Sequence, residues 1–225
     1  MSDDTEIVFL GINDAGMRVY NWLCDRNGVF VRSLLTTREQ LSSVRETQPE
    51  FVVSCGYSHI VPDDILSIPS GGCLNLHPGY LPYNRGANPN VWSIVDDTPA
   101  GATLHYMDES LDTGDIVARK GVSTDFADTG KSLHQRLEDA QVELFKQHWP
   151  EIEAGEESVT AQPEEGTYHR TDDFEELCEL NPDEEMRVEE LLNRLRALTF
   201  PPYDNAFIEL EGERFYVDVE IERAE

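Results

Sequence analysis

Basic residues are scarce in this chain of 225 residues, which has 17 lysines and arginines against 45 aspartates and glutamates. Lysine is the rarer of the two basic types and occurs only as Lys120, Lys131 and Lys146. The formal net charge of -28 at pH 7 argues against nonspecific binding to nucleic acid, because such binding needs basic side chains that neutralise phosphates. A local basic pocket is still compatible with this composition.

The acidic residues are spread along the chain between apolar residues and are not gathered in one tail. Hydrophobic residues make up 39% of the sequence, a content that is ordinary for a folded protein. At molar ionic strength the repulsion between charges is screened within ~3 Å. The distribution of charge therefore predicts a halophilic protein that works in a salt-rich cytoplasm.

Cysteine is also sparse and shows no paired spacing. We expect reduced, mostly packed thiols at Cys24, Cys55, Cys73 and Cys178. The sequence lacks a signal peptide and an apolar run of membrane length, which predicts a soluble cytoplasmic protein without a membrane partner.

Strand and helix patterns alternate along the first 150 or so residues. A short buried strand is expected at 7–10 and further strands at 29–35 and 51–54, with helices at 17–24 and 38–48 between them. This alternation implies right-handed crossovers and a mostly parallel sheet with helices on both faces, a Rossmann-like α/β fold. The turn from Gly11 to Gly16 lacks a full Gly-x-Gly-x-x-Gly fingerprint, which argues against a nicotinamide cofactor.

The remaining sequence predicts a smaller C-terminal part. We expect a catalytic domain at 1–154, a linker region at 155–180 and a small appendage at 181–225. The start of the linker is acidic, contains proline and has few bulky apolar residues. In the appendage, Asn181 and Pro182 predict the start of a helix, and a β-hairpin is expected after it.

Two polar segments carry the strongest functional signal. In the first, Leu74 and Leu76 alternate with Asn75 and His77, so one strand would present both polar side chains on the same face at its carboxyl end. In the second, a strand at 102–107 runs into a turn that would bring Asp112 to the same rim. An amide, an imidazole and a carboxylate are therefore expected to converge, although singly each is more often a structural residue.

The Asn-x-His-Pro segment at 75–78 and the Leu-Asp-x-Gly segment at 111–114 resemble the formyltransferases that use formyl-tetrahydrofolate. The similarity is strongest from 72 to 117 and continues more weakly from 7 to 148. It implies that Asn75, His77 and Asp112 are the catalytic residues. Formyl transfer to an amine needs a donor to an oxyanion, an acceptor for the amine proton and a proton for the departing folate nitrogen, and these residue types can supply all three.

The resemblance also implies that 10-formyl-tetrahydrofolate is the co-substrate and lies along residues 54–62 and near 108–112. The residues expected to contact it are Gly56, Tyr57, Ile60, Val61 and Asp108. His105, within a predicted strand, is expected to be a packed or rim residue. The histidine spacings do not suit metal ligation, so no metal is expected.

The loop at 81–92 and the segments at 166–170 and 198–203 look like those of the sugar N-formyltransferases, which act on nucleotide-linked amino sugars. Under this interpretation the sugar nucleotide contacts Tyr83, Arg85, Asn88, Asn90 and Tyr203. Two alternatives stay open. One is a methionyl-tRNA formyltransferase, which shares the Arg-Gly loop but carries an extra barrel, for which ~60 remaining residues leave too little room. The other is a hydrolase in which water replaces the amine. The sequence does not fix the oligomeric state, and a homodimer is compatible with it.

Overall fold

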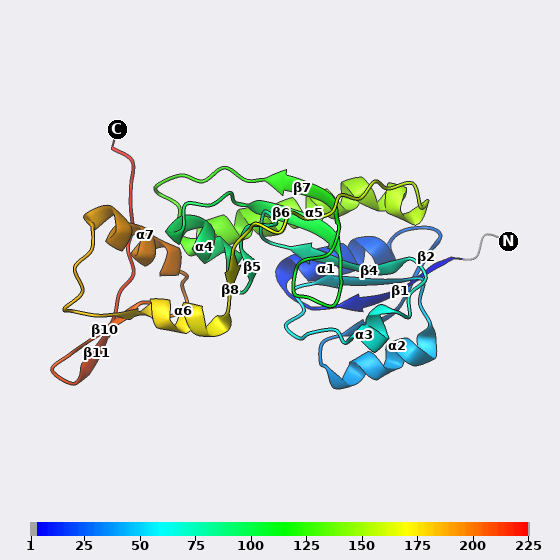
Figure 1. The fold of residues 1–225 in the computed structure, drawn as a ribbon, viewed down its shortest axis with the longest axis horizontal. Coiled ribbons are helices and arrows are strands. Elements are labelled where there is room, and N and C mark those ends of the chain that lie inside the picture. The colour runs from blue at the N-terminus through cyan, green and yellow to red at the C-terminus, as the bar shows by residue number, and fades with distance from the viewer. Residues whose placement is uncertain (1–3, 225) are drawn as a thin grey trace.

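The structure, a computed structural model, describes residues 4–224. Its main body is a six-stranded sheet in the order β2-β1-β3-β4-β6-β7 (Figure 1). The strands are β1 (Thr5–Leu10), β2 (Val29–Leu35), β3 (Phe51–Cys55), β4 (Gly72–His77), β6 (Gly101–Tyr106) and β7 (Ile116–Gly121). Strands β1 to β4 run parallel, whereas β6 and β7 are antiparallel additions. The predicted α/β fold with a mostly parallel sheet is confirmed.

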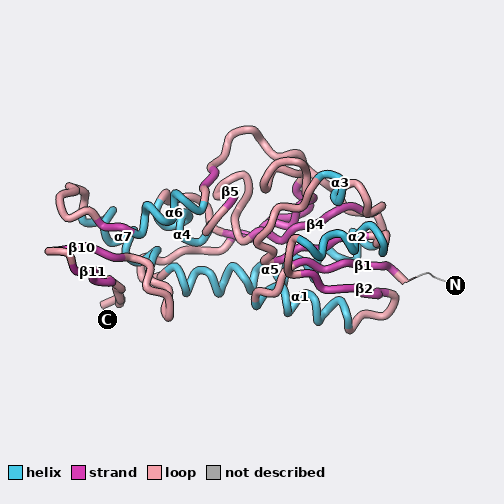
Figure 2. The backbone as a smooth tube through the Cα atoms, turned by 90° about the horizontal axis from the view of Figure 1, so that it is seen from below, coloured by secondary structure: helices cyan, strands magenta, loops and turns pink. Residues whose placement is uncertain are grey.

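Helices cover both faces of this sheet. On one face the helices are α1 (Asp14–Cys24) and α5 (Gly130–Glu153), and on the other they are the short α2 (Ser42–Thr47), preceded by a 3-10 turn (Glu39–Leu41), and α3 (Asp63–Leu66). Because side chains alternate along a strand, Ile7 and Phe9 join the core beneath α1 and α5. Val8 and Leu10 join the core beneath α2 and α3. Figure 2 shows the helices on the two sides of the strands.

The start of α1 is fixed by contacts within the protein. The Asn13 side chain accepts a hydrogen bond from the Gly16 N–H at 2.8 Å, and a Glu138 carboxylate oxygen lies 3.5 Å from the Ala15 N–H. A Cβ on Gly11 would lie 2.2 Å from the Cys55 carbonyl oxygen, so this turn packs directly against β3. Two N–H groups of the first turn of α1 are therefore bonded within the protein.

The C-terminal part lies at the end of the molecule opposite to the N-terminus (Figure 1). Its elements are α6 (Thr171–Cys178), β9 (Glu179–Leu180), α7 (Val188–Leu198), β10 (Phe207–Leu210) and β11 (Glu213–Tyr216). Strands β9 to β11 form a small second sheet. A shared core joins this part to the main body, because Leu195 and Leu198 of α7 pack with Leu133 of α5 and Val91 of α4 (Pro89–Val95).

The helix expected to start at Asn181 and Pro182 is a wrong prediction. Asn181 instead closes a local turn, because its side chain accepts a hydrogen bond from the Asp183 N–H at 3.0 Å. Helix α7 begins several residues later, at Val188. There the Arg187 N–H donates to the Glu190 carboxylate at 3.1 Å.

The segment from 155 to 180, predicted as a linker, is bonded to the main body over much of its length. Ile116 of β7 forms a β-bridge with Thr160. The short strand β8 (Tyr168–His169) pairs in parallel with β5 (Arg85–Gly86), and α6 follows directly. This stretch therefore lies against β5 and the start of β7. None of the described helices is long and apolar enough to cross a membrane.

Candidate functional site

Strands β4 and β6 place the polar side chains of the site. They pair antiparallel, with Asn75 opposite His105. Leu74 and Leu76 are buried in the core, so Asn75 and His77 lie on the opposite face of β4. This alternation is the feature from which the sequence predicted the pair.

Asp112 lies in the loop between β6 and β7 and is 8% exposed. One of its carboxylate oxygens accepts a hydrogen bond from the Asn75 amide nitrogen at 3.4 Å. The other lies 3.6 Å from His77 Nδ1 and accepts a hydrogen bond from the Gly86 N–H at 2.9 Å. The structure thus brings together the amide, the imidazole and the carboxylate that the sequence singled out.

Hydrogen bonding fixes which nitrogen of His77 can exchange a proton. Its Nε2 lies 2.8 Å from the Asn84 carbonyl oxygen. A carbonyl oxygen can only accept, so Nε2 carries a hydrogen and donates it. The nitrogen that faces Asp112 is therefore Nδ1, which can take up or release a proton beside that carboxylate.

His105 belongs to the same polar cluster, although the sequence predicted only a packed or rim residue. Its Nδ1 donates to the Tyr106 carbonyl oxygen at 2.7 Å, and its Nε2 lies 3.2 Å from the Asn75 amide nitrogen. Burial lowers the pKa of His105 to about 4, so the ring is neutral at neutral pH and Nε2 accepts a hydrogen bond from Asn75. Only the pairing register of β4 and β6 reveals this contact, and a single sequence does not give that register.

A cleft of about 700 Å³ opens over these side chains at the carboxyl ends of β3 and β4. It is lined by all the residues predicted to contact the folate, namely Gly56, Tyr57, Ile60, Val61 and Asp108. The Asp108 carboxylate also accepts hydrogen bonds from the Ser110 N–H and the Thr113 hydroxyl, which hold the turn that contains Asp112. A mostly apolar cleft with a few converging polar groups is typical of a small-molecule site.

The residues predicted to contact the sugar nucleotide are divided between this cleft and other places. Asn88 and Asn90 line it, but Asn90 is 6% exposed and its amide donates to the Gly130 carbonyl oxygen, which ties α4 to α5. Tyr83, Arg85 and Tyr203 are not among the lining residues. The sequence also missed α4 itself, because Asn88, Pro89 and Asn90 resembled a loop.

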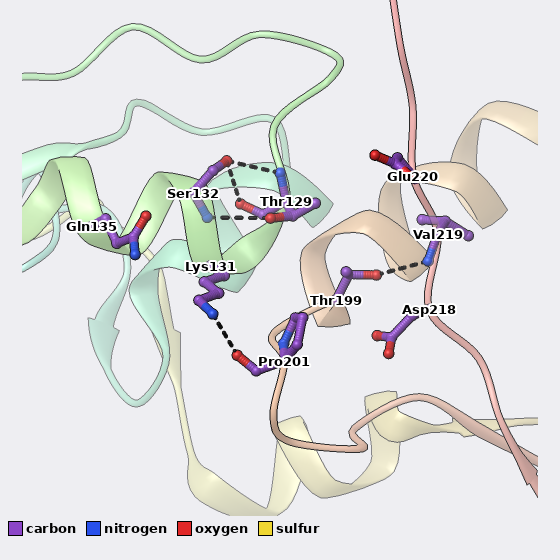
Figure 3. Close-up of a pocket in the computed structure, with 9 residues that line it drawn as sticks. All are labelled: Thr129, Lys131, Ser132, Gln135, Thr199, Pro201, Asp218, Val219 and Glu220. Carbon is purple, nitrogen blue, oxygen red and sulfur yellow. Dashed lines mark hydrogen bonds between the residues drawn. The ribbon is translucent and has the colours of Figure 1, made fainter.

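A second cavity, of about 510 Å³, lies between the start of α5 and the C-terminal tail (Figure 3). Several polar groups around it are already bonded within the protein. Lys131 Nζ donates to the Pro201 carbonyl oxygen at 2.8 Å, and the Val219 N–H donates to the Thr199 hydroxyl at 3.1 Å (Figure 3). None of the predicted site residues lines it, so we assign the functional site to the larger cleft. Residues 4–224 contain no group of three or more metal-ligating side chains placed to hold a metal ion.

Two family models match this chain. Residues 14–148 match the formyl transferase family, and residues 173–223 match the N-formyltransferase dimerization C-terminal domain. The first match covers more than half of the chain and contains every residue of the polar cluster.

Individual relatives agree with these matches. A dTDP-4-amino-4,6-dideoxyglucose formyltransferase of Mycobacterium bovis is 38% identical over 151 residues, 67% of this chain and 64% of that protein. The chain thus spans less than two thirds of the length of this curated relative. A 4-N formyltransferase from Francisella tularensis superposes with a TM-score of 0.88 at 27% identity, over 98% of this chain and 99% of that chain.

A further solved structure is that of the formyltransferase PseJ from Anoxybacillus kamchatkensis, in complex with UDP-4,6-dideoxy-4-formamido-L-AltNAc and tetrahydrofolate. It is 33% identical with a TM-score of 0.67, over 76% of this chain and 88% of that chain. The family match, the relatives and the polar cluster at the strand ends lead to one conclusion: this chain belongs to the formyl transferase family.

Proposed function

We propose that this protein transfers a formyl group from 10-formyl-tetrahydrofolate to the primary amine of a nucleotide-linked amino sugar. The observation that carries the proposal is the meeting of Asn75, His77 and Asp112 at the cleft, with separations of 3.4 and 3.6 Å from the carboxylate. Two relatives support this chemistry. One is named as a dTDP-4-amino-4,6-dideoxyglucose formyltransferase, and the other was solved in complex with a UDP-formamido sugar and tetrahydrofolate.

The proposed reaction assigns a distinct task to each polar side chain. The amine nitrogen attacks the formyl carbon, the carbonyl oxygen becomes an oxyanion, and the bond from that carbon to the folate nitrogen then breaks. Asn75 donates an N–H to the oxyanion. His77 Nδ1 and the Asp112 carboxylate receive the amine proton and return a proton to the departing folate nitrogen.

The Asn75 amide is held in a way that suits this task. One of its N–H groups is bonded to His105 at 3.2 Å. The other makes the longer contact of 3.4 Å to Asp112, and a long hydrogen bond is the weaker of the two. The oxyanion replaces Asp112 as the acceptor of this second N–H, while His105 keeps the amide in place.

The folate is proposed to occupy the part of the cleft formed by Gly56, Tyr57, Ile60, Val61 and Asp108. The sugar is proposed to approach from the side of Asn88 and Thr171, which also line this cleft. Tyr83 and Tyr203 do not line the cleft in this structure. Their contacts with the nucleotide therefore stay a prediction from the sequence.

A homodimer formed through the C-terminal part is also proposed, because residues 173–223 match a dimerization domain. The hairpin of β10 and β11 leaves Leu210, Phe215 and Tyr216 about half exposed, and these apolar groups suit a surface covered by a second copy. The halophilic, cytoplasmic setting is a proposal that rests on the dispersed carboxylates.

The function is tested by incubating the protein with 10-formyl-tetrahydrofolate in the presence and absence of dTDP- and UDP-linked 4-amino sugars. We expect release of tetrahydrofolate that depends on the amine, and a gain of the mass of one formyl group on the sugar nucleotide. Release without any amine would indicate the hydrolase instead. Formylation of methionyl-tRNA, with no response to any amino sugar, would overturn the proposal in favour of the tRNA enzyme.

A further inference from the structure

The backbone of Asp112 adopts a conformation that needs external support. Its φ is 56°, in the left-handed region that a residue with a side chain rarely occupies. Such a conformation costs about 1–3 kcal/mol and persists only where the surrounding structure holds it. The groups that contact this loop therefore decide whether the Asp112 carboxylate faces Asn75 and His77.

The main-chain support comes from Gln162, in the segment predicted as a linker. Its Nε2 donates to the Asp112 carbonyl oxygen at 2.9 Å and to the Gly114 carbonyl oxygen at 2.8 Å. Two N–H groups of one amide thus bond the residue with the strained backbone and the residue two positions later. No sequence pattern indicated this role, because Gln162 is remote in the chain and lies among acidic loop residues.

Arg85 fixes the orientation of the Gln162 amide. Its Nε and Nη2 donate to Gln162 Oε1 at 3.2 and 2.9 Å. A guanidinium group has no acceptor, so the amide oxygen must face Arg85 and the amide nitrogen must face the two carbonyl oxygens. All donors and acceptors of the Gln162 side chain are then used, which favours one rigid arrangement.

Two nitrogens of the Arg85 guanidinium, Nε and Nη2, are bonded within the protein. Among residues 4–224 no carboxylate lies within ion-pair distance of its guanidinium, which bonds Gln162 and the Pro163 carbonyl oxygen instead. The next residue, Gly86, donates its N–H to the Asp112 carboxylate. Gly86 therefore bonds the Asp112 side chain directly. Arg85 acts on the Asp112 main chain indirectly, because it orients the Gln162 amide that bonds the Asp112 carbonyl oxygen.

We infer that Arg85 and Gln162 are positioning residues for the reaction: they hold the Asp112 loop so that its carboxylate meets Asn75 and His77. This inference rests on the proposed function for its kinetic consequence, and it replaces the predicted contact of Arg85 with the sugar nucleotide. A small misplacement of a reacting group can lower the rate ~100-fold. Loss of this support is therefore expected to lower kcat and to leave KM for the sugar nucleotide nearly unchanged.

The test is a double-mutant cycle of Arg85→Met and Gln162→Leu. We expect each single variant to lower kcat by about 10- to 100-fold, with KM for the sugar nucleotide within about 2-fold of the wild type. The double variant should be no slower than the slower single variant, because both substitutions break one network. Gln162→Glu keeps an acceptor for Arg85 but loses the donors to the two carbonyl oxygens, so its kcat should fall like that of Gln162→Leu.

Gln135→Leu is the matched control, because Gln135 is exposed and lines the second cavity; its kinetics should equal those of the wild type. If Arg85→Met raises KM by about 10-fold or more while Gln162→Leu keeps normal kinetics, the inference is overturned and Arg85 is restored as a substrate contact. A crystal structure of Gln162→Leu gives a readout that needs no substrate. We expect the Asp112 carboxylate to be displaced from Asn75 and His77, and an unmoved loop would equally overturn the inference.

Discussion

His77 and His105 both face Asp112, but their hydrogen bonds place their protons differently. The Nε2 of His77 donates to a carbonyl oxygen, which leaves Nδ1 beside the carboxylate. In His105 the arrangement is reversed, because Nδ1 donates to the Tyr106 carbonyl oxygen and Nε2 accepts from Asn75. One histidine is thus set up to exchange protons and the other to hold an amide.

Asp112→Asn keeps the shape of the side chain and removes its charge. We expect kcat to fall at least ~100-fold with the fold intact, because the pair that handles the proton is broken. The measurement is the steady-state rate of formyl transfer, with the circular dichroism spectrum as a check on folding. Asp115→Asn is the matched control, since Asp115 is an exposed neighbour in the same loop. A near-normal rate for Asp112→Asn would refute the role of this carboxylate.

His105 makes the stability depend on pH. Its pKa in the folded protein is about 4, below the ordinary value of 6.5, because burial disfavours the charged ring. As pH falls below 6.5 the unfolded chain gains a proton that the folded chain does not take, so stability is lost down to pH 4. Between pH 7 and 4 the wild type should lose about 3 kcal/mol more than His105→Asn.

This difference is measured by denaturant unfolding at several pH values. The variant His148→Asn serves as a control, because His148 is a partly exposed histidine of α5 that lies outside the polar cluster. It should follow the wild type over the whole range. Parallel curves for wild type and His105→Asn would mean that the buried ring does not cause the acid sensitivity.

At the scale of elements, the sequence predicted the strands better than the helix boundaries. Segments rich in β-branched and other apolar residues, such as 29–35 and 51–54, stand out in the sequence and agree with β2 and β3. Helix starts depend on capping bonds, and the bond of Asn13 to Gly16 places α1 three residues earlier than its apolar pattern does. Contacts between distant segments could be predicted only where motifs marked both partners, as for Asn75 and Asp112, so the roles of Gln162 and His105 were missed.

The short pairing of β5 with β8 is expected to depend on one glycine. Gly86 has a φ of 87°, and a Cβ there would lie 2.2 Å from the His169 carbonyl oxygen. Gly86→Ala should therefore separate β5 from β8 and withdraw the N–H from Asp112, with a stability loss of ~2 kcal/mol or more. Thermal unfolding and the formyl-transfer rate together report both effects.

Gly155→Ala is the matched substitution for this comparison. Gly155 also has a positive φ, of 64°, but no atom lies within 4 Å of the added Cβ. It should show only the backbone strain of ~1 kcal/mol and keep full activity. Equal losses of stability in Gly86→Ala and Gly155→Ala would show that the close contact between Gly86 and the His169 carbonyl oxygen does not matter for stability.

At the scale of the whole molecule, the acidic surface and the shared core act in opposite directions. At a net charge of -28 the carboxylates repel one another and destabilise the compact state. The core formed by α4, α5 and α7, in contrast, ties the C-terminal part to the main body. Ion pairs such as Arg18 with Asp139 and Lys120 with Glu143 use up many of the few cations. Most of the carboxylates must therefore be balanced by the solvent.

Salt should stabilise the protein strongly. Between dilute buffer and molar KCl we expect the melting temperature to rise steeply, because the screening length shrinks from ~30 Å at 0.01 M to ~3 Å at 1 M. Differential scanning fluorimetry in a KCl series measures this directly. A flat or falling melting temperature would contradict a halophilic setting.

The pairing of β5 with β8 also has a consequence for protein engineering. All of the proposed catalytic side chains precede residue 113, and the family model for the catalytic part ends at residue 148. A recombination junction placed there would keep each of these side chains and yet replace Gln162 and β8 by a foreign sequence. Chimaeras that exchange C-terminal parts between relatives should therefore be joined after His169, so that the segment which shapes the cleft is inherited together with the cleft.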